Sequence, residues 1–241
     1  MKAVILAAGY ATRLYPLTHD APKHLLEVGG RPILDRLLEQ LPLEELDTVY
    51  VITNAKFADR FREWAAAFSA ARVEVIDDGT TSEDDKLGAI GDLALAIEQK
   101  GIDDDLLIAA GDSLFTERLD GIVSFGRERD AFTVSVYDVG DLEAIRRLSS
   151  LGVDAEGRVV SFEEKPESPT STLAGIALYY YPRSCLPLVT EYLADGNNPD
   201  QPGRLVEWLY TLVPVYAWRV PGRWIDVGTP DALAEAEQAL A

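Results

Sequence analysis

The sequence predicts an α/β fold in which a mostly parallel sheet is flanked by helices. Short β-branched, apolar segments alternate with segments whose apolar residues recur at helical spacing, which is typical of strand–helix–strand units. The chain has 241 residues, 47 % of them hydrophobic, so it can bury a substantial core. Parallel strands joined by crossovers bind ligands beyond their carboxyl ends. We therefore look for chemistry in the loops that follow predicted strands.

Local patterns place the individual elements. Lys2–Ala8 is a continuous apolar run that ends at Gly9, which indicates a buried strand followed by a loop. The stripe Phe57, Phe61, Trp64 and Phe68 lies at helical spacing and is typical of core packing. Further strands are predicted at 48–53, 73–76, 106–110, 131–137, 157–164, 173–181 and 214–220, and helices at 32–41, 56–70, 85–99, 182–194 and 231–240.

After about residue 140 the chain becomes richer in strands. The segments 157–164 and 173–181 are candidates to pair with each other. No linker long enough to separate domains is present, so we expect one domain, 1–241, with a first half at about 1–138 and a second at about 139–241. The three tyrosines at 179–181 suggest either an interface between copies of the chain or core packing, and a homo-oligomer is left open.

The composition restricts the partners. A net charge of −19 repels nucleic acid and anionic membranes, so neither is expected as a partner. Nucleotides would be repelled as well unless basic side chains gather locally. No apolar run reaches the ~20 residues that cross a bilayer. The first residues do not form a secretory signal, and the single cysteine, Cys185, allows no internal disulfide, so we expect a cytoplasmic protein.

The loop after the first strand is the first candidate site. Small residues at 7–9 allow backbone N–H groups to approach a phosphate closely. Arg13 adds a planar fork of donors and Lys23 a point charge. The loop is not a P-loop, because the Gly-Lys-Ser/Thr ending is absent. From spacing alone, a surface loop with two solvated charges remains an equal alternative.

Two aspartates form the second candidate site. Asp112 follows the predicted strand 106–110, and Asp226 lies in the segment 224–230. Two carboxylates are a minimal protein contribution to a magnesium site, which phosphates and water would complete. A turn or helix-capping role is the alternative for Asp226. The third candidate is Glu164-Lys165-Pro166, where Lys165 could anchor a second phosphate or be an exposed charge at a strand end.

Together these motifs resemble the sugar-phosphate nucleotidyltransferases, such as glucose-1-phosphate thymidylyltransferase and its uridylyl and cytidylyl relatives. The resemblance covers nearly the whole chain. It includes the N-terminal loop, Gly111-Asp112, Glu164-Lys165-Pro166 and the run from Trp224 to Thr229. It implies a Rossmann-like fold of the nucleotide-diphospho-sugar transferase type, with a smaller strand-rich substrate lobe. The partners would be a nucleoside triphosphate and a phosphorylated small molecule, and the cofactor Mg²⁺.

The resemblance also implies a role for each matching position. Catalysis would depend on Arg13, Lys23, Asp112 and Asp226, of which the two aspartates would ligate Mg²⁺. The nucleotide would be bound by the first half of the chain, and the second substrate mainly by the second half. Nucleotide-binding residues would be Ala7, Ala8, Gly9, Ala11, Thr12, Arg13, Lys23, Thr81, Gly88 and Asp112. Substrate-binding residues would be Ser113, Gly152, Glu164, Lys165, Ala174, Gly175 and Trp224.

Departures from the family pattern keep the substrate open. Ala11 replaces the second glycine of the loop, which is acceptable if its φ is negative, and His24 follows Lys23 where a small residue or proline is commoner. Ser113 stands where asparagine is frequent in sugar-specific members. The expected reaction is nucleotidyl transfer to a sugar 1-phosphate, giving an NDP-sugar and pyrophosphate. A cytidylyltransferase for a non-sugar phosphate such as phosphocholine, or a catalytically silent nucleotide-binding regulatory module, are the alternatives.

Overall fold

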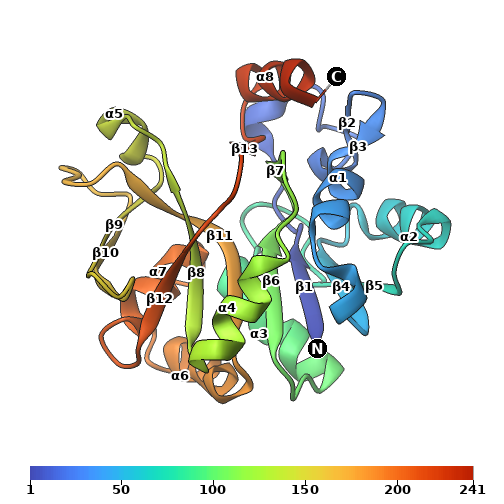
Figure 1. Ribbon diagram of the computed structural model, residues 1–241. Helices are drawn as coiled ribbons and strands as arrows, with labels where there is room; N and C mark the ends of the chain where they lie inside the picture. The colour runs from blue at the N-terminus through green and yellow to red at the C-terminus, as the bar shows by residue number, and fades with distance from the viewer. Residues whose placement is uncertain (241) are drawn as a thin grey trace. The chain divides into compact units, whose positions relative to one another are not determined.

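Seven strands form the central sheet of the protein, and the computed structural model describes residues 1–240 (Figure 1). The strand order is β12-β8-β11-β6-β1-β4-β5. The pairs β1/β4, β4/β5 and β12/β8 are parallel, whereas β11 runs antiparallel to β8. The predicted mostly parallel α/β sheet is therefore confirmed. The seven strands are β1 (Lys2–Leu6), β4 (Thr48–Thr53), β5 (Val73–Asp77), β6 (Leu106–Ala110), β8 (Phe132–Asp138), β11 (Leu173–Tyr181) and β12 (Val215–Arg219).

Three short antiparallel pairs lie outside this sheet. They are β2 (Glu27–Val28) with β3 (Arg31–Pro32), β7 (Ser113–Phe115) with β13 (Trp224–Asp226), and β9 (Ser149–Val153) with β10 (Val159–Glu164). The suggested pairing of 157–164 with 173–181 is wrong. Strand β10 pairs with β9, a strand that the sequence pattern did not indicate, and β11 pairs with β8.

The predicted helices form, most of them with shorter bounds, and further helices appear. Helix α3 begins at Ala89 instead of at residue 85, because Gly88 has φ 80° and the 199–200 backbone sets the first residue of the helix. One of these further helices starts at Pro202, so the polar segment 197–203 includes the first two residues of a helix. The helices are α1 (Ile33–Gln40), α2 (Ala58–Ala67), α3 (Ala89–Lys100), α4 (Gly121–Arg129), α5 (Leu142–Ile145), α6 (Leu186–Ala194), α7 (Pro202–Leu209) and α8 (Pro230–Leu240).

The chain divides into two compact units, each made of separate stretches of sequence. Unit 1 comprises residues 1–87, 109–120 and 221–241, and unit 2 comprises residues 88–108 and 121–220. This division differs from the expected halves at 138, because the chain returns to unit 1 at both 109–120 and 221–241. The return brings distant parts of the sequence into the same unit.

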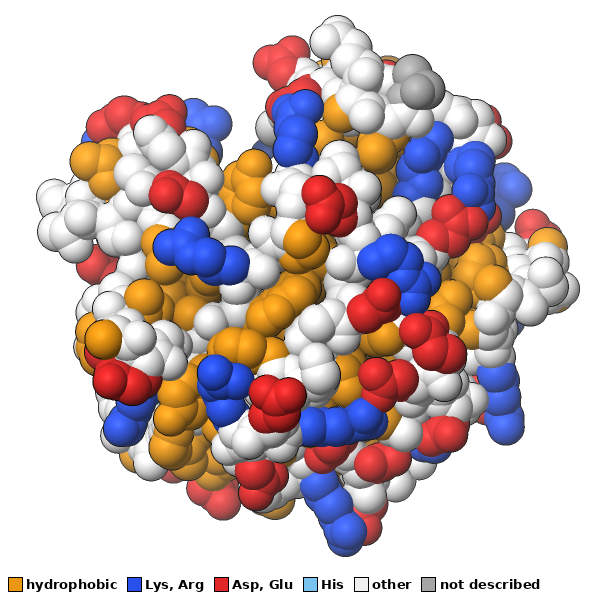
Figure 2. Space-filling model, in the orientation of Figure 1, with side chains coloured by type: hydrophobic (Ala, Val, Ile, Leu, Met, Phe, Trp, Pro, Cys, Tyr) orange, Lys and Arg blue, Asp and Glu red, His pale blue; other side chains and the backbone are white. Residues whose placement is uncertain are grey.

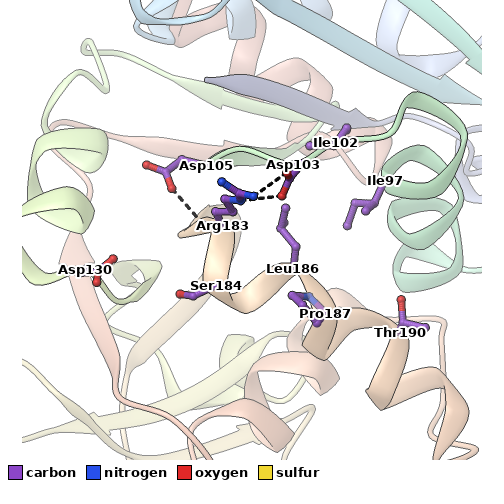
Figure 3. A pocket seen from close by; sticks show the side chains of 10 residues that line it. All are labelled: Ile97, Ile102, Asp103, Asp105, Asp130, Arg183, Ser184, Leu186, Pro187 and Thr190. Carbon is purple, nitrogen blue, oxygen red and sulfur yellow. Dashed lines mark hydrogen bonds and ion pairs between the residues drawn. The ribbon is translucent and has the colours of Figure 1, made fainter.

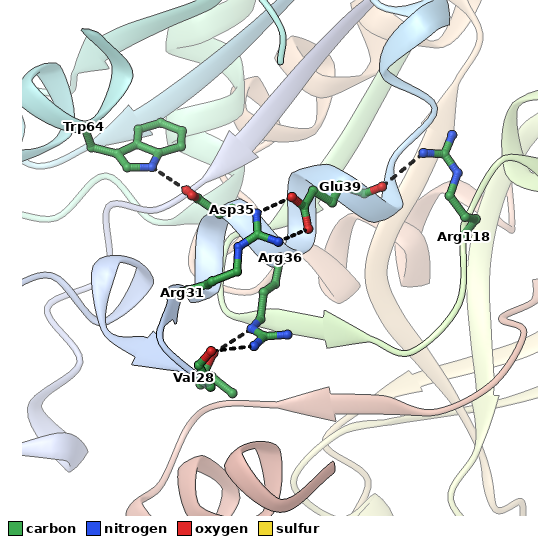
Figure 4. Close-up of polar contacts among 8 residues, drawn as sticks. Val28, Arg31, Asp35, Arg36, Glu39, Trp64 and Arg118 are labelled. Carbon is green, nitrogen blue, oxygen red and sulfur yellow. Dashed lines mark hydrogen bonds and ion pairs between the residues drawn. The ribbon is translucent and has the colours of Figure 1, made fainter. Parts of the chain in front are cut away.

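In unit 1, helix α1 is fixed by polar contacts (Figure 4). Arg36 donates to the Val28 carbonyl at 2.6 Å, and Arg31 forms a two-pronged ion pair with Glu39. The Trp64 indole donates to Asp35 at 2.6 Å. The aromatic stripe of α2 is thus core only in part: Phe57 and Phe61 are buried, whereas Trp64 and Phe68 stay partly exposed.

In unit 2, the antiparallel pair β8/β11 forms the core, with α4 in front of the strands and α7 behind them in Figure 1. Tyr179, Tyr180 and Tyr181 are all at most 2 % exposed. They pack within the unit, and the Tyr180 hydroxyl donates to Asp105 at 2.6 Å. These tyrosines therefore belong to the core and give no support to an interface between copies.

On the face drawn in Figure 2, acidic and basic side chains are interspersed, without a continuous basic stripe of the kind that follows a phosphate backbone. The exclusion of nucleic acid and membranes as partners stays a prediction. Residues 1–240 include no helix with the length and apolar character that crossing a bilayer requires.

Candidate active site

The pairing of β7 with β13 brings the two predicted aspartates together in unit 1. Asp226 is the register partner of Ser113, and the Val227 amide donates to the Asp112 carbonyl at 3.0 Å. The Gly111 amide donates to the Leu6 carbonyl at 2.9 Å, which sets the 111–113 turn beside the end of β1. Residues separated by more than a hundred positions thus meet at one edge of the sheet.

Lys23 is the counter-charge of this pair. Its ammonium contacts the Asp112 carboxylate, and both side chains are largely buried. Burial alone would raise the pKa of Asp112, but the Lys23 ammonium holds that pKa below its usual value. Desolvation and repulsion from Asp112 raise the pKa of Asp226 to about 6, against the opposing charges of Lys23 and Arg13. The residue Asp226 remains exposed to solvent, so its carboxylate stays accessible.

The two carboxylates fit the donor set of a magnesium ion. Divalent cations of this size prefer oxygen ligands and keep several waters, and the mutual repulsion of Asp112 and Asp226 is what a cation would relieve. Residues 1–240 contain no group of three or more His, Cys, Asp or Glu side chains arranged to hold a metal. The protein therefore offers two ligands, and phosphate oxygens and water would have to supply the others.

The loop that carries Arg13 has a glycine-like turn at Ala11. Ala11 has φ 50° and ψ 41°, in the left-handed region that favours glycine, so the condition of a negative φ for alanine at this position is not met. Its carbonyl accepts hydrogen bonds from the Thr18 hydroxyl at 2.7 Å and the Leu14 amide at 3.0 Å. These bonds hold a glycine-like turn with an alanine. Thr12 starts the short 3-10 turn 12–14 and is exposed, as is Arg13.

His24 is buried next to this charged group. Its side chain packs against Gly111, where a Cβ would lie 2.9 Å from the His24 Cδ2. Burial and the neighbouring Lys23 charge lower the pKa of His24 to about 3. His24 is therefore a neutral, enclosed imidazole that packs against the 111–112 turn. This packing explains why histidine follows Lys23 here, where the family pattern has a small residue or proline.

The small-residue loop 7–9 is held by an asparagine that the sequence analysis missed. The fully buried Asn54 donates to the Ala8 carbonyl at 2.7 Å and accepts from the Phe57 amide at 3.2 Å. Ala7 donates to the Ile52 carbonyl. Open space lies over Gly9, where a Cβ would meet no atom within 4 Å. The position of Asn54, directly after a buried strand, was the available signal.

The segment 78–85 closes on itself beside the loop. The Thr80 hydroxyl contacts the N-terminal loop, where it lies 3.2 Å from the Tyr10 hydroxyl. Thr81 is bonded to Asp85 through its amide and hydroxyl, and its contact with a nucleotide stays a prediction. Ser113 and Trp224 bond to each other, the indole donating to the buried hydroxyl at 3.2 Å. This bond joins the two segments that carry Asp112 and Asp226.

In unit 2, Gly88 has a packing role. A Cβ there would lie 2.6 Å from the Pro199 carbonyl oxygen and 2.8 Å from the Asp200 Cα. The Ile90 amide donates to Pro199 at 2.9 Å and the Ala89 amide to Asp200 at 3.3 Å. The start of α3 is therefore capped by the 199–200 backbone. Glycine at 88 is required by this contact, whatever further role the position has toward a base.

Unit 2 also holds most of the residues predicted to bind the second substrate, whereas Ser113 and Trp224 lie in unit 1. Burial raises the pKa of Glu164 to about 7, against the charges of Lys165 and Arg204. Strand β10 ends at Glu164, and Lys165 turns out of it with φ 52°. Lys165 therefore lies just beyond the strand and does not continue its alternation of faces. A lysine held in a left-handed conformation is strained, and such strain is often found at functional sites.

The three remaining predicted residues in unit 2, Gly152, Ala174 and Gly175, have contacts within the protein. Ala174 is fully buried, and Gly152 pairs with Ser161. Gly175 and Ser149 bond reciprocally, amide to hydroxyl and hydroxyl to carbonyl, both at 2.9 Å. These positions are structural in the protein alone, and their contact with a substrate stays a prediction.

A separate cavity of about 650 Å³ in unit 2 has no predicted site residue in its lining (Figure 3). Arg183 lies across it and bonds Asp103 with both prongs of its guanidinium at 2.6 Å, while its amide donates to Asp105 at 3.0 Å. Asp103 and Asp105 are thus both engaged with Arg183. We assign this cavity no part in the chemistry.

Comparisons with known proteins agree with this geometry. The sequence model of the family described as nucleotidyl transferase matches residues 2–241. The bifunctional protein GlmU of Methanocaldococcus jannaschii is 26 % identical over the whole chain, which spans 54 % of that protein. The UTP–glucose-1-phosphate uridylyltransferase AglF of Haloferax volcanii is 27 % identical, with 100 % of this chain and 96 % of that protein covered.

A solved structure shows the same fold. The crystal structure of a protein from Bacillus anthracis assigned as a glucose-1-phosphate thymidylyltransferase, in complex with sucrose, superposes with a TM-score of 0.85. The two chains are 23 % identical, and the alignment covers 99 % of this chain and 94 % of the other. At that identity the likeness establishes the fold, and the substrate must be argued separately.

Proposed function

This chain belongs to the nucleotidyl transferase family, and from that premise we propose that it transfers a nucleotidyl group from a nucleoside triphosphate to a sugar 1-phosphate. The observation that carries the proposal is the adjacency of Asp112 and Asp226, with the cations Lys23 and Arg13 acting on them. In a protein of net negative charge, two basic side chains beside two carboxylates would provide a local site for a metal-bound triphosphate.

In the proposed reaction, a phosphate oxygen of the sugar 1-phosphate attacks the α-phosphorus of the nucleotide. The new P–O bond forms as the bond to the β-phosphate oxygen breaks, and pyrophosphate leaves with that electron pair. A phosphate monoester has its second pKa at about 6, so the nucleophile is already anionic near neutral pH. No general base is required. The buried His24, whose pKa is lowered to about 3, is not placed to act as one.

The residues of unit 1 would bind and orient the triphosphate. Lys23, now paired with Asp112, would turn its ammonium toward phosphate oxygens once a cation reached the carboxylates. Arg13 would add a planar fork of donors. Asp112 and Asp226 would hold Mg²⁺, which when bound supplies charge neutralisation on the transferring phosphate. Catalysis of this kind depends on positioning and electrostatics and needs no covalent intermediate.

The residues of unit 2 would select the acceptor. Glu164 would accept hydrogen bonds from sugar hydroxyls, and Lys165 would neutralise the phosphate of the acceptor. Because AglF is named a UTP–glucose-1-phosphate uridylyltransferase and aligns over nearly its whole length, UTP with glucose 1-phosphate is the first pair to assay.

The test is a matrix of nucleoside triphosphates against phosphorylated acceptors, with and without Mg²⁺, in which pyrophosphate release is measured. We expect release with at least one sugar 1-phosphate, dependent on added Mg²⁺. Release only with phosphocholine would replace the sugar by a non-sugar acceptor. Nucleotide binding without release for every acceptor would indicate a regulatory module instead of an enzyme.

A further inference from the structure

A glycine at the start of helix α7 contacts the predicted sugar-binding carboxylate. The carboxylate of Glu164 lies directly over Gly203, where a Cβ would overlap Glu164 Oε2 and lie 2.9 Å from its Cδ. Gly203 is buried and helical, with no positive φ that would require glycine. Its missing side chain therefore provides space, and that space is occupied by the end of Glu164.

The strand that carries Glu164 is fixed from the same side. The Phe162 ring is buried between two glycines: a Cβ at Gly175 would lie 2.8 Å from its Cε2, and one at Gly203 would lie 3.6 Å from its Cε1. Phe162 and Glu164 are two residues apart on β10 and share a face. The buried ring holds the face of β10 that also carries Glu164, and the atoms of Glu164 that a side chain at 203 would meet are those at its flexible end.

The surroundings of α7 act on the carboxylate in both directions: burial and the Glu207 charge oppose its ionised form, whereas the charges of Lys165 and Arg204 favour it. Glu164 sits at the N-terminal end of the helix, where backbone N–H groups favour an anion. Arg204 follows Gly203 but is engaged with Gln201 at 2.7 Å and Glu207 at 3.9 Å. It therefore stabilises Glu164 at a distance and leaves its carboxylate oxygens available to a ligand.

We propose that Gly203 is a positioning residue for acceptor recognition, because its missing side chain lets the Glu164 carboxylate take the position from which it binds the hydroxyl groups of the sugar 1-phosphate. This inference rests on the proposed function. Its consequence is specific: a methyl group at 203 displaces the end of Glu164 while the helix, for which alanine is the better former, is retained.

The experiment compares Gly203→Ala, Glu164→Ala and the double variant with the wild-type chain, using UTP and glucose 1-phosphate or the active pair from the matrix above. We expect Gly203→Ala to raise the KM for the sugar phosphate at least 10-fold, with the KM for the nucleotide and kcat within about threefold of wild type. In the Glu164→Ala background the same substitution should have no further effect, because the conflict is gone. The melting temperature should not fall.

A second readout does not depend on activity. In protein with ¹³C-labelled glutamate carboxyls, the Glu164 signal should titrate near pH 7 in the wild type and closer to its ordinary value in Gly203→Ala. An unchanged titration, or a KM effect that persists in the Glu164→Ala background, would overturn the role of Gly203. A wild-type chain inactive with every sugar phosphate would overturn the proposed function and the role in sugar recognition with it.

Discussion

The two predicted binding regions, the charged group in unit 1 and the surroundings of Glu164 in unit 2, are positioned by different physical means. In unit 1, charges are placed against charges: Lys23 contacts Asp112, and Asp226 is held beside Asp112 by strand pairing. In unit 2, the carboxylate of Glu164 is placed by the space over Gly203 and by the packed ring of Phe162. Substitutions in unit 1 should therefore act mainly through electrostatics, and substitutions around Glu164 mainly through shape.

The largest effect should come from Asp226→Asn. Losing this carboxylate removes one of two proposed metal ligands and should lower kcat/KM by about 10³-fold. The fold should be retained, because Asp226 repels Asp112 and its neutralisation relieves that repulsion. Pyrophosphate release and thermal unfolding measure the two effects. The matched control is Asp231→Asn, which removes an acidic side chain in the first turn of α8. Near-wild-type pyrophosphate release by Asp226→Asn would contradict the assignment of Asp226 as a metal ligand.

Lys23→Met should lower kcat/KM by on the order of 10²-fold and, unlike Asp226→Asn, should also destabilise unit 1. Asp112 would lose its largely buried partner, and removing one partner of a well-enclosed ion pair costs about 3–5 kcal/mol. Denaturant unfolding without nucleotide measures this. If Lys23→Met and Asp226→Asn change stability in the same direction, the charge-against-charge description of unit 1 is wrong.

The pH dependence should reveal the raised pKa of Glu164, which acts in the same direction as the raised pKa of Asp226 in unit 1 but extends higher, to about pH 7. Folded Glu164 has its pKa raised to about 7 from an ordinary 4.5, so between those values the folded state binds a proton that the unfolded state has lost. The contribution of Glu164 to stability therefore falls as pH rises from 4.5 to 7. Its ionised form accepts hydroxyl hydrogen bonds, so the KM for the sugar phosphate should fall severalfold as pH rises through 7.

The control for this pH effect is Glu164→Gln. The acceptor phosphate titrates near pH 6 with either protein, so only the part of the profile that disappears in the variant belongs to Glu164. A wild-type KM profile identical to that of Glu164→Gln would show that the carboxylate does not meet the acceptor.

The smallest expected effect is at Ala11. Glycine removes the cost of a left-handed alanine, so Ala11→Gly should stabilise the protein by up to about 1 kcal/mol. Urea unfolding measures the gain, and pyrophosphate release should be unchanged within twofold. Ala65→Gly, inside helix α2, should instead destabilise by about 0.5–1 kcal/mol. A loss of stability with Ala11→Gly would contradict the strain assigned to this turn.

Much of the fold was predictable because local patterns determine it. The strands 48–53 and 106–110 form with the predicted bounds, since runs of apolar, β-branched residues suit buried parallel strands. Elements whose residues give mixed signals were missed, among them β7, β13 and α7. Helix α3 starts later than predicted because Gly88, with φ 80°, and the 199–200 backbone set its first residue at Ala89.

By itself the sequence determined the chemical types at the candidate site and the strand ends that carry them: the cations of the N-terminal loop, Asp112 after β6, and the Glu164-Lys165 pair. Only the tertiary structure decided their partners. The pairing of β7 with β13 joins Asp112 to Asp226, and the approach of α7 to β10 seats Glu164 over Gly203. The reason is physical: residue type and local period are encoded over a few positions, whereas contacts across a hundred residues depend on how packed surfaces complement each other.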